Sequence, residues 1–115
     1  MAFTELEQAR CERGLQSFMK RRRPPPHVRP KLDHGYRISG QSVELFDIRP
    51  DWQNPNQKRE TPFAKATYVR SQNHWNVFWM RSDLKWHGYE PQPTVNSLAR
   101  FLEVVHKDEY CCFFG

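Results

Sequence analysis

Residues 63–81, FAKATYVRSQNHWNVFWMR, decide the fold of this chain. Two stretches within them, 63–70 and 75–81, alternate apolar and polar side chains, which predicts two half-buried β-strands. The SQNH segment between the strands contains Gln72-Asn73, a pair that can form a tight turn. Small residues facing large rings are what a packed sheet face needs. In the expected hairpin, one face brings together Ala64, Ala66 and Tyr68 with Trp75, Val77 and Trp79.

A second hairpin precedes this one in the chain. Alternation predicts strands at 34–39 and 42–49, and Gly40 between them supplies the positive φ that a two-residue turn requires. A single register then places one opposite-charge pair and two apolar pairs across the strands, which is better evidence than either strand alone. The pairs are Ile38 with Val43, Arg37 with Glu44 and Tyr36 with Leu45.

Helices flank the strands at both ends. Thr4 and Glu7 form a capping-box pattern, so we expect a first helix over residues 5–22. Three prolines at 24–26 end it, and the basic, Pro-rich linker 23–33 should run extended. A second helix is expected over 94–107, capped by Thr94, and an apolar tail over 108–115 should dock on the core. The apolar residues with helical spacing are Val95, Leu98, Phe101, Leu102 and Val105.

These elements predict one small α+β domain with the order α-β-β-β-β-(β)-α. An antiparallel sheet of four to five strands over 34–90 packs with an N-terminal and a C-terminal helix. A fifth, short strand is expected over 84–89, and the polar, Pro-containing segment 50–62 is expected to be a mobile loop. A chain of 115 residues is long enough for one domain with one core.

No apolar run approaches the roughly 18 residues that cross a bilayer, and the N-terminal sequence lacks a signal-peptide pattern. We therefore expect no membrane partner. Three cysteines, two of them adjacent, argue against a disulfide framework and fit a reducing compartment. The expected location is the cytoplasm.

The positive charge of the chain is concentrated near its beginning. Of the net charge of +5, residues 1–35 hold most, with eight Lys and Arg against four Asp and Glu. Residues 20–31 hold six of these cations and no acid. An anionic partner, either nucleic acid or an acidic protein, should therefore meet the chain there first.

Five strings run through residues 24–115: PPPHVR, GYRISGQSVELFDIRP, PFAKATYVR, WNVFWMRSDLKWHGYEPQP and CCFFG. Together they resemble a family of small uncharacterised bacterial proteins, domain of unknown function 3024. The resemblance implies a bacterial, cytoplasmic protein of one domain. It supplies no activity and therefore implies no catalytic residue.

Metal and cofactor chemistry lacks complete motifs. Asp47, Glu44 and Lys65 stand near the positions that a restriction-type nuclease needs, but Phe63 occupies the place of the second acidic ligand. The three cysteines have no C-x-x-C spacing for zinc. No glycine-rich loop opens a helix after a strand, which disfavours ATP- or NAD-dependent chemistry. We predict no metal, no cofactor and no catalytic residue.

Basic residues interleaved with aromatic ones indicate a non-enzymatic module that binds single-stranded nucleic acid or RNA, although the tryptophans also suit a small core. The expected interface residues are Lys20, Arg21, Arg22, Arg23, Arg29, Arg81, Lys85, Trp86, His87 and Tyr89.

Two alternatives stay open. In a toxin-like, metal-independent ribonuclease, the general base would come from His74, Arg81, Lys85 or His87. In a protein-interaction module, the basic arm would dock on an acidic protein, or an exposed sheet edge would accept a strand.

Overall fold

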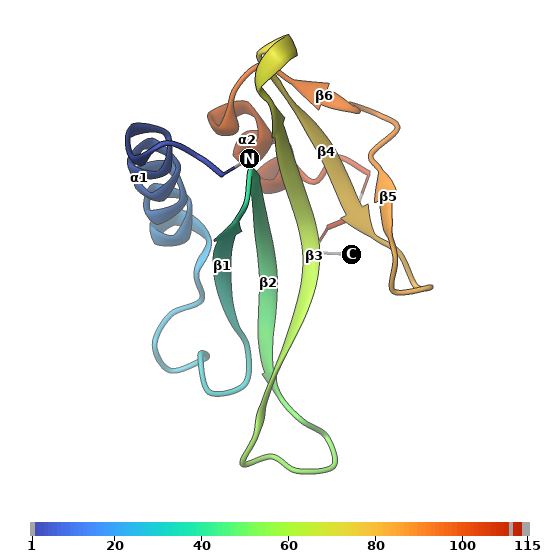
Figure 1. Ribbon diagram of the computed structural model, residues 1–115. Coiled ribbons are helices and arrows are strands. Elements are labelled where there is room, and N and C mark those ends of the chain that lie inside the picture. Colours follow the sequence, from blue (N-terminus) through green and yellow to red (C-terminus); the bar gives the residue numbers. More distant parts are fainter. Residues whose placement is uncertain (1, 111, 114–115) are drawn as a thin grey trace.

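The computed structural model describes residues 2–110 and 112–113. It forms one antiparallel sheet flanked by two helices, so the predicted α+β fold is confirmed (Figure 1). Strands β1 to β5 lie side by side in chain order, and β6 also pairs with β4. In chain order the elements are α1 (Glu5–Arg22), β1 (Asp33–Ser39), β2 (Ser42–Pro50), β3 (Lys58–Val69), the 3-10 helix η1 (Arg70–Gln72), β4 (His74–Met80), β5 (Trp86–Gly88), β6 (Thr94–Val95) and α2 (Leu98–Lys107).

Both predicted hairpin registers are confirmed. Strand β1 pairs with β2 as Tyr36 with Leu45 and Ile38 with Val43, and Gly40 in the turn has a φ of 61°. Strand β3 pairs with β4 through the predicted face, and Asn73 in the connection adopts a φ of 52°. The pairs on that face are Ala64 with Trp79, Ala66 with Val77 and Tyr68 with Trp75.

Both helices cover the same face of the sheet. In Figure 1, α2 lies behind the sheet and α1 lies at the β1 side. Cys11, Leu15 and Phe18 are the buried residues of α1. They belong to one core with residues of α2 and of the sheet: Phe101, Leu102, Val105, Val43, Leu45, Ala64, Ala66, Trp75 and Val77. The opposite face of the sheet, which we call the open face, carries Glu44 paired with Lys65.

The structure corrects the linker prediction. Residues 26–31 are not extended but form consecutive turns. The Val28 N–H donates to the Pro25 carbonyl and the Lys31 N–H to the Val28 carbonyl, each at 2.9 Å. Local backbone hydrogen bonds therefore replace the polyproline conformation, because only residues 24–26 and 30 are prolines and the other residues keep their N–H donors.

Two further boundaries differ from the predictions. Strand β3 begins at Lys58 rather than at residue 63, because Glu60 and its neighbours pair with the end of β2 past a register shift between Leu45 and Phe46. Helix α2 begins at Leu98 rather than at residue 94, because Val95 pairs with Trp75 as part of β6. Ser97, not Thr94, caps the helix by accepting from the Arg100 N–H. The fifth strand is also shorter than predicted.

The residues after α2 return to the core. Phe113 is buried and its ring centroid lies 4.9 Å from that of Tyr89. The rest of the predicted apolar tail at residues 111 and 114–115 lies outside the described residues. Within the described part of the chain, no helix is both long enough and apolar enough to span a bilayer.

Candidate nucleic-acid interface

The structure separates the predicted interface residues into two groups. One group lies at the end of α1 and in the loop leading to β1. The other lies around β5, at the opposite edge of the sheet. Four strand spacings separate β1 from β5, roughly 19 Å. The first group is Lys20, Arg21, Arg22, Arg23 and Arg29, and the second is Arg81, Lys85, Trp86, His87 and Tyr89.

We call residues 20–31 the basic edge. Lys20 and Arg21 are exposed in the last turn of α1, where cations are favoured by the helix dipole. The Arg23 guanidinium donates two hydrogen bonds of 2.8 Å to the Asp33 carboxylate, and this contact lowers the pKa of the Asp33 carboxyl. Arg29 donates to the Pro24 carbonyl at 2.9 Å. Arg23 and Arg29 thus hold the loop in its conformation, while Lys20 and Arg21 present their charges to solvent.

A groove of about 510 Å³ adjoins the basic edge. We call it the α1–β1 groove. Tyr36 from β1 and Phe46 from β2 give it aromatic walls, and cations from α1 stand at its side. Its lining residues are Gln16, Met19, Lys20, Arg23, His34, Gly35, Tyr36 and Phe46. A concave site with apolar walls and a few polar groups has the general form of a ligand site.

Gly35 is needed for the shape of this groove. A Cβ at Gly35 would come within 2.7 Å of the Phe46 ring, closer than carbon atoms approach without a shift. The ring therefore packs directly on the glycine backbone, and the Arg37 guanidinium covers it at 4.7 Å from its centroid. The sequence pattern assigned neither Tyr36 nor Phe46 to a site, because the groove appears only when α1 packs beside β1.

The residues considered for a metal nuclease do not converge. His34 Nδ1 lies 2.9 Å from Asp47 Oδ1, and His34 lies two residues from Tyr36, whose side chain packs on the core. Asp47 therefore points to the helix-covered side. Glu44 and Lys65 pair on the open face instead. Among the described residues, no three His, Cys, Asp or Glu side chains are grouped to hold a metal ion.

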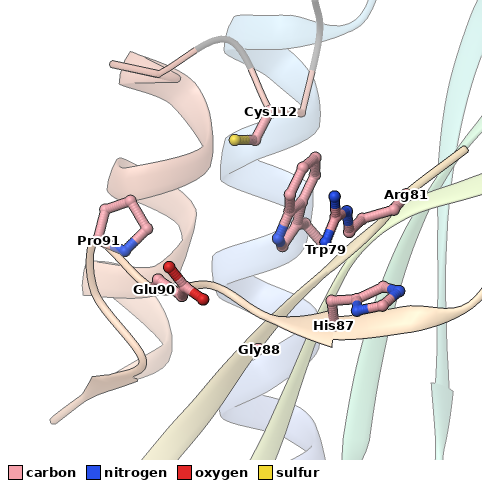
Figure 2. A pocket seen from close by; sticks show the side chains of 7 residues that line it. All are labelled: Trp79, Arg81, His87, Gly88, Glu90, Pro91 and Cys112. Atoms are coloured by element: carbon pink, nitrogen blue, oxygen red, sulfur yellow. The ribbon is translucent and has the colours of Figure 1, made fainter.

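Two residues of the second group, Arg81 and His87, line a pocket of about 340 Å³, which we call the Trp79 pocket (Figure 2). The Arg81 guanidinium lies 5.5 Å from the Trp79 ring centroid. His87 pairs with Trp79 across β4 and β5, which brings its ring to the same side. The full lining is Trp79, Arg81, His87, Gly88, Glu90, Pro91 and Cys112.

An acidic residue orients the pocket histidine. His87 Nε2 lies 2.8 Å from Asp83 Oδ2, and the Lys85 N–H donates to Asp83 Oδ1 at 3.0 Å. The hydrogen bond with His87 is the main cause, and the Lys85 N–H the second cause, of a lowered pKa of the Asp83 carboxyl. A carboxylate on one ring nitrogen fixes the ring and leaves Nδ1 as the nitrogen for other contacts.

The other predicted residues near β5 do not join this pocket. Tyr89 is only 2% exposed, so its ring cannot stack a base. Trp86 lies on the open face, where Lys65 Nζ is 5.5 Å from the ring centroids of both Trp86 and Phe78. Lys85 is exposed in the turn before β5.

Five of the seven lining residues are absent from the predicted interface: Trp79, Gly88, Glu90, Pro91 and Cys112. Trp79 was assigned to the core, and it does contact the core while also lining the pocket. The sequence could have indicated Trp79 as a pocket residue only through the strand register, which pairs Trp79 with His87. Glu90 and Cys112 reach the pocket from segments with no periodic pattern, so no sequence signal pointed to them.

The cysteine chemistry is limited by burial. Cys11 is 4% exposed, and burial raises the pKa of its thiol to about 11. At neutral pH this thiol is protonated, which makes it a poor nucleophile and a poor metal ligand. Cys112 is partly exposed at the rim of the Trp79 pocket.

Comparison with known proteins gives a family and no activity. No curated protein and no solved structure matches the chain. A family model described as a domain of unknown function (DUF3024) matches residues 3–115. The match includes both helices and every strand, so the chain belongs to the DUF3024 family.

Proposed function

We propose that this protein is a non-enzymatic module that binds single-stranded nucleic acid, RNA foremost, through the basic edge and the α1–β1 groove. One observation carries the proposal. Residues 20–31 hold six Lys and Arg, and two of them, Lys20 and Arg23, line a groove with aromatic walls. Cations for phosphates and rings for bases are the two components of sequence-tolerant single-strand binding.

The cations supply most of the affinity. Each phosphate that Lys20, Arg21 or a neighbouring cation neutralises releases condensed counterions, and this gain does not depend on base sequence. Arg23 and Arg29 keep the loop in place through Asp33 and Pro24. The sugar–phosphate backbone of the bound nucleic acid therefore lies along the end of α1.

The groove selects unpaired bases. Tyr36 is half-buried and Phe46 is buried, and both line the groove, so it offers a base an aromatic edge and an apolar wall. A base can enter only when it is unstacked from its neighbours, which favours loops and single strands over duplexes. Contacts of a base with an aromatic side chain contribute about 1–3 kcal/mol.

A cytoplasmic location and a bacterial origin belong to the same proposal. The chain has three cysteines, two of them adjacent, which does not suit a disulfide framework and supports a reducing compartment. Bacterial origin follows from the strings that resemble the family.

The test removes charge from the basic edge and keeps the fold. In the triple variant Lys20→Gln, Arg21→Gln and Arg22→Gln, Arg23 stays in place to hold Asp33. Fluorescence anisotropy with a short labelled single-stranded RNA should show at least about tenfold weaker binding, since three phosphate contacts are lost.

The matched control removes the same charge elsewhere. The variant Arg49→Gln, Arg59→Gln and Lys107→Gln should bind within about threefold of the natural sequence, since only its net charge changes. Equal losses in both variants would contradict a specific basic edge. RNA that shortens during the incubation would contradict a non-enzymatic role. Capture of an acidic protein without any binding of RNA would replace nucleic acid with protein as the partner.

A further inference from the structure

The Trp79 pocket has a chemistry of its own, separate from the basic edge. Its volume, about 340 Å³, is in the range of small-molecule sites, about 300–1,000 Å³. It combines one large aromatic ring, two basic side chains and one carboxylate, from Trp79, Arg81, His87 and Glu90. A nucleotide is a ligand that presents both a flat ring and an anionic group.

The Arg81 and His87 side chains of the pocket are held in position. The Arg81 guanidinium lies 5.5 Å from the Trp79 ring centroid, close enough for a cation–π contact that restrains a flexible side chain. His87 is fixed by Asp83 at 2.8 Å and is about one third exposed. A planar guanidinium is suited to the several oxygens of a phosphate. With Nε2–H donated to Asp83, the doubly protonated form of His87 donates its Nδ1–H to one further phosphate oxygen.

Trp79 provides a surface for a flat ring. Its ring contacts the core and also lines the pocket. Figure 2 shows Trp79 in the centre, with Arg81 on one side and Pro91 and Glu90 on the other. A base stacked on this ring would have the Glu90 carboxylate as an acceptor for its N–H groups, because a carboxylate only accepts hydrogen bonds.

We propose that the Trp79 pocket binds a single nucleotide, with the base against Trp79 and the phosphate against Arg81 and His87. This inference does not rest on the proposed function of the basic edge, because the two sites share no residue. The nucleotide can be free in solution or be the phosphorylated end of an RNA strand, since both present the same base and phosphate.

The experiment measures binding of nucleoside 5′-monophosphates by calorimetry. Binding should be saturable, and it should be at least about tenfold weaker in Arg81→Gln, which loses a charge-assisted contact to the phosphate. The matched nucleosides, which lack the phosphate, should also bind at least about tenfold more weakly. The control Arg49→Gln removes one charge at a distant strand and should bind as the natural sequence does.

A second variant tests the stacking contact. Trp79→Leu should weaken monophosphate binding by a larger factor than binding of inorganic phosphate, because only the monophosphate has a base to stack on the ring. Since Trp79 contacts the core, circular dichroism has to show that the variant is folded, and Arg81→Gln decides the question if it is not. Monophosphate binding that is absent, or unchanged by Arg81→Gln, would overturn the proposal.

The basic-edge variant Lys20→Gln, Arg21→Gln, Arg22→Gln distinguishes the two sources of the nucleotide, which are a free monophosphate and the phosphorylated end of an RNA strand. Free monophosphates should bind to it with unchanged affinity, even if the basic edge proves to bind no RNA. If a short RNA with a 5′-phosphate binds to this variant more tightly than the same RNA with a 5′-hydroxyl, the strand end is the ligand. Equal binding of the two RNAs assigns the pocket to free nucleotides.

Discussion

At the scale of single residues, Gly35 shows how a small side chain sets the shape of a site. The Phe46 ring occupies the space that a Cβ at Gly35 would need. The sequence places Gly35 in a predicted strand, where glycine usually weakens pairing. Its role cannot be inferred from the strand pattern, because it depends on a ring in the neighbouring strand.

Gly35→Ala should therefore lower the free energy of unfolding by about 1–3 kcal/mol, since the new Cβ would lie 2.7 Å from the Phe46 ring and force a shift. Urea unfolding measures the loss. Gly88→Ala is the matched control, because a Cβ there meets nothing within 4 Å. Its stability should change by less than about 0.5 kcal/mol. Equal effects of the two substitutions would contradict the packing of Phe46 on Gly35.

At the scale of elements, the strands were more predictable than the segments between them. Opposed pairs such as Tyr36 with Leu45 and Ala66 with Val77 fixed both registers, because a one-residue slip would move every apolar side chain to the wrong face. Turns 26–31 and the β6–α2 boundary were missed. The β6–α2 boundary depends on a tertiary contact, the pairing of Val95 with Trp75, whereas turns 26–31 form through local backbone hydrogen bonds that a Pro-rich composition does not indicate.

The segment after α2 is expected to depend on one ring. Phe113 is only 5% exposed, and its ring packs against that of Tyr89. Phe113→Ala should therefore lower the free energy of unfolding by about 3 kcal/mol, because apolar burial is lost and a cavity is left. Thermal or urea unfolding measures this. Tyr110→Ala, in the same segment but 60% exposed, should change stability by less than about 0.5 kcal/mol. If the two variants are equally stable, Phe113 does not anchor the segment.

At the scale of the whole molecule, the interface is only partly visible in the sequence. The basic edge follows from a run of cations, since residues 20–31 are close together in any fold. The Trp79 pocket does not, because its residues come from β4, β5 and the segment after α2. Arg81 and His87 could be predicted from strand alternation. Tyr89 could not be excluded until its burial was known.

The open face differs in charge from the helix-covered side. Glu44 pairs with Lys65 there, and Arg37 lies 3.3 Å from Glu60, so its charges are balanced within the sheet. The largest local excess of positive charge is at the end of α1 and in the loop that follows, where residues 20–31 hold six Lys and Arg and no acid. A polyanion should therefore approach the basic edge first.

The dependence of single-stranded RNA affinity on salt tests the central claim most directly. Plotted as the logarithm of the association constant against the logarithm of salt concentration, the natural sequence should give a slope of about −2 or steeper, from roughly −0.7 per phosphate contact. In the variant Lys20→Gln, Arg21→Gln, Arg22→Gln the slope should be shallower by about 2, since three such contacts are lost. An affinity that does not change with salt, or a slope that is the same in the variant, would contradict the assignment of the basic edge as the nucleic-acid interface.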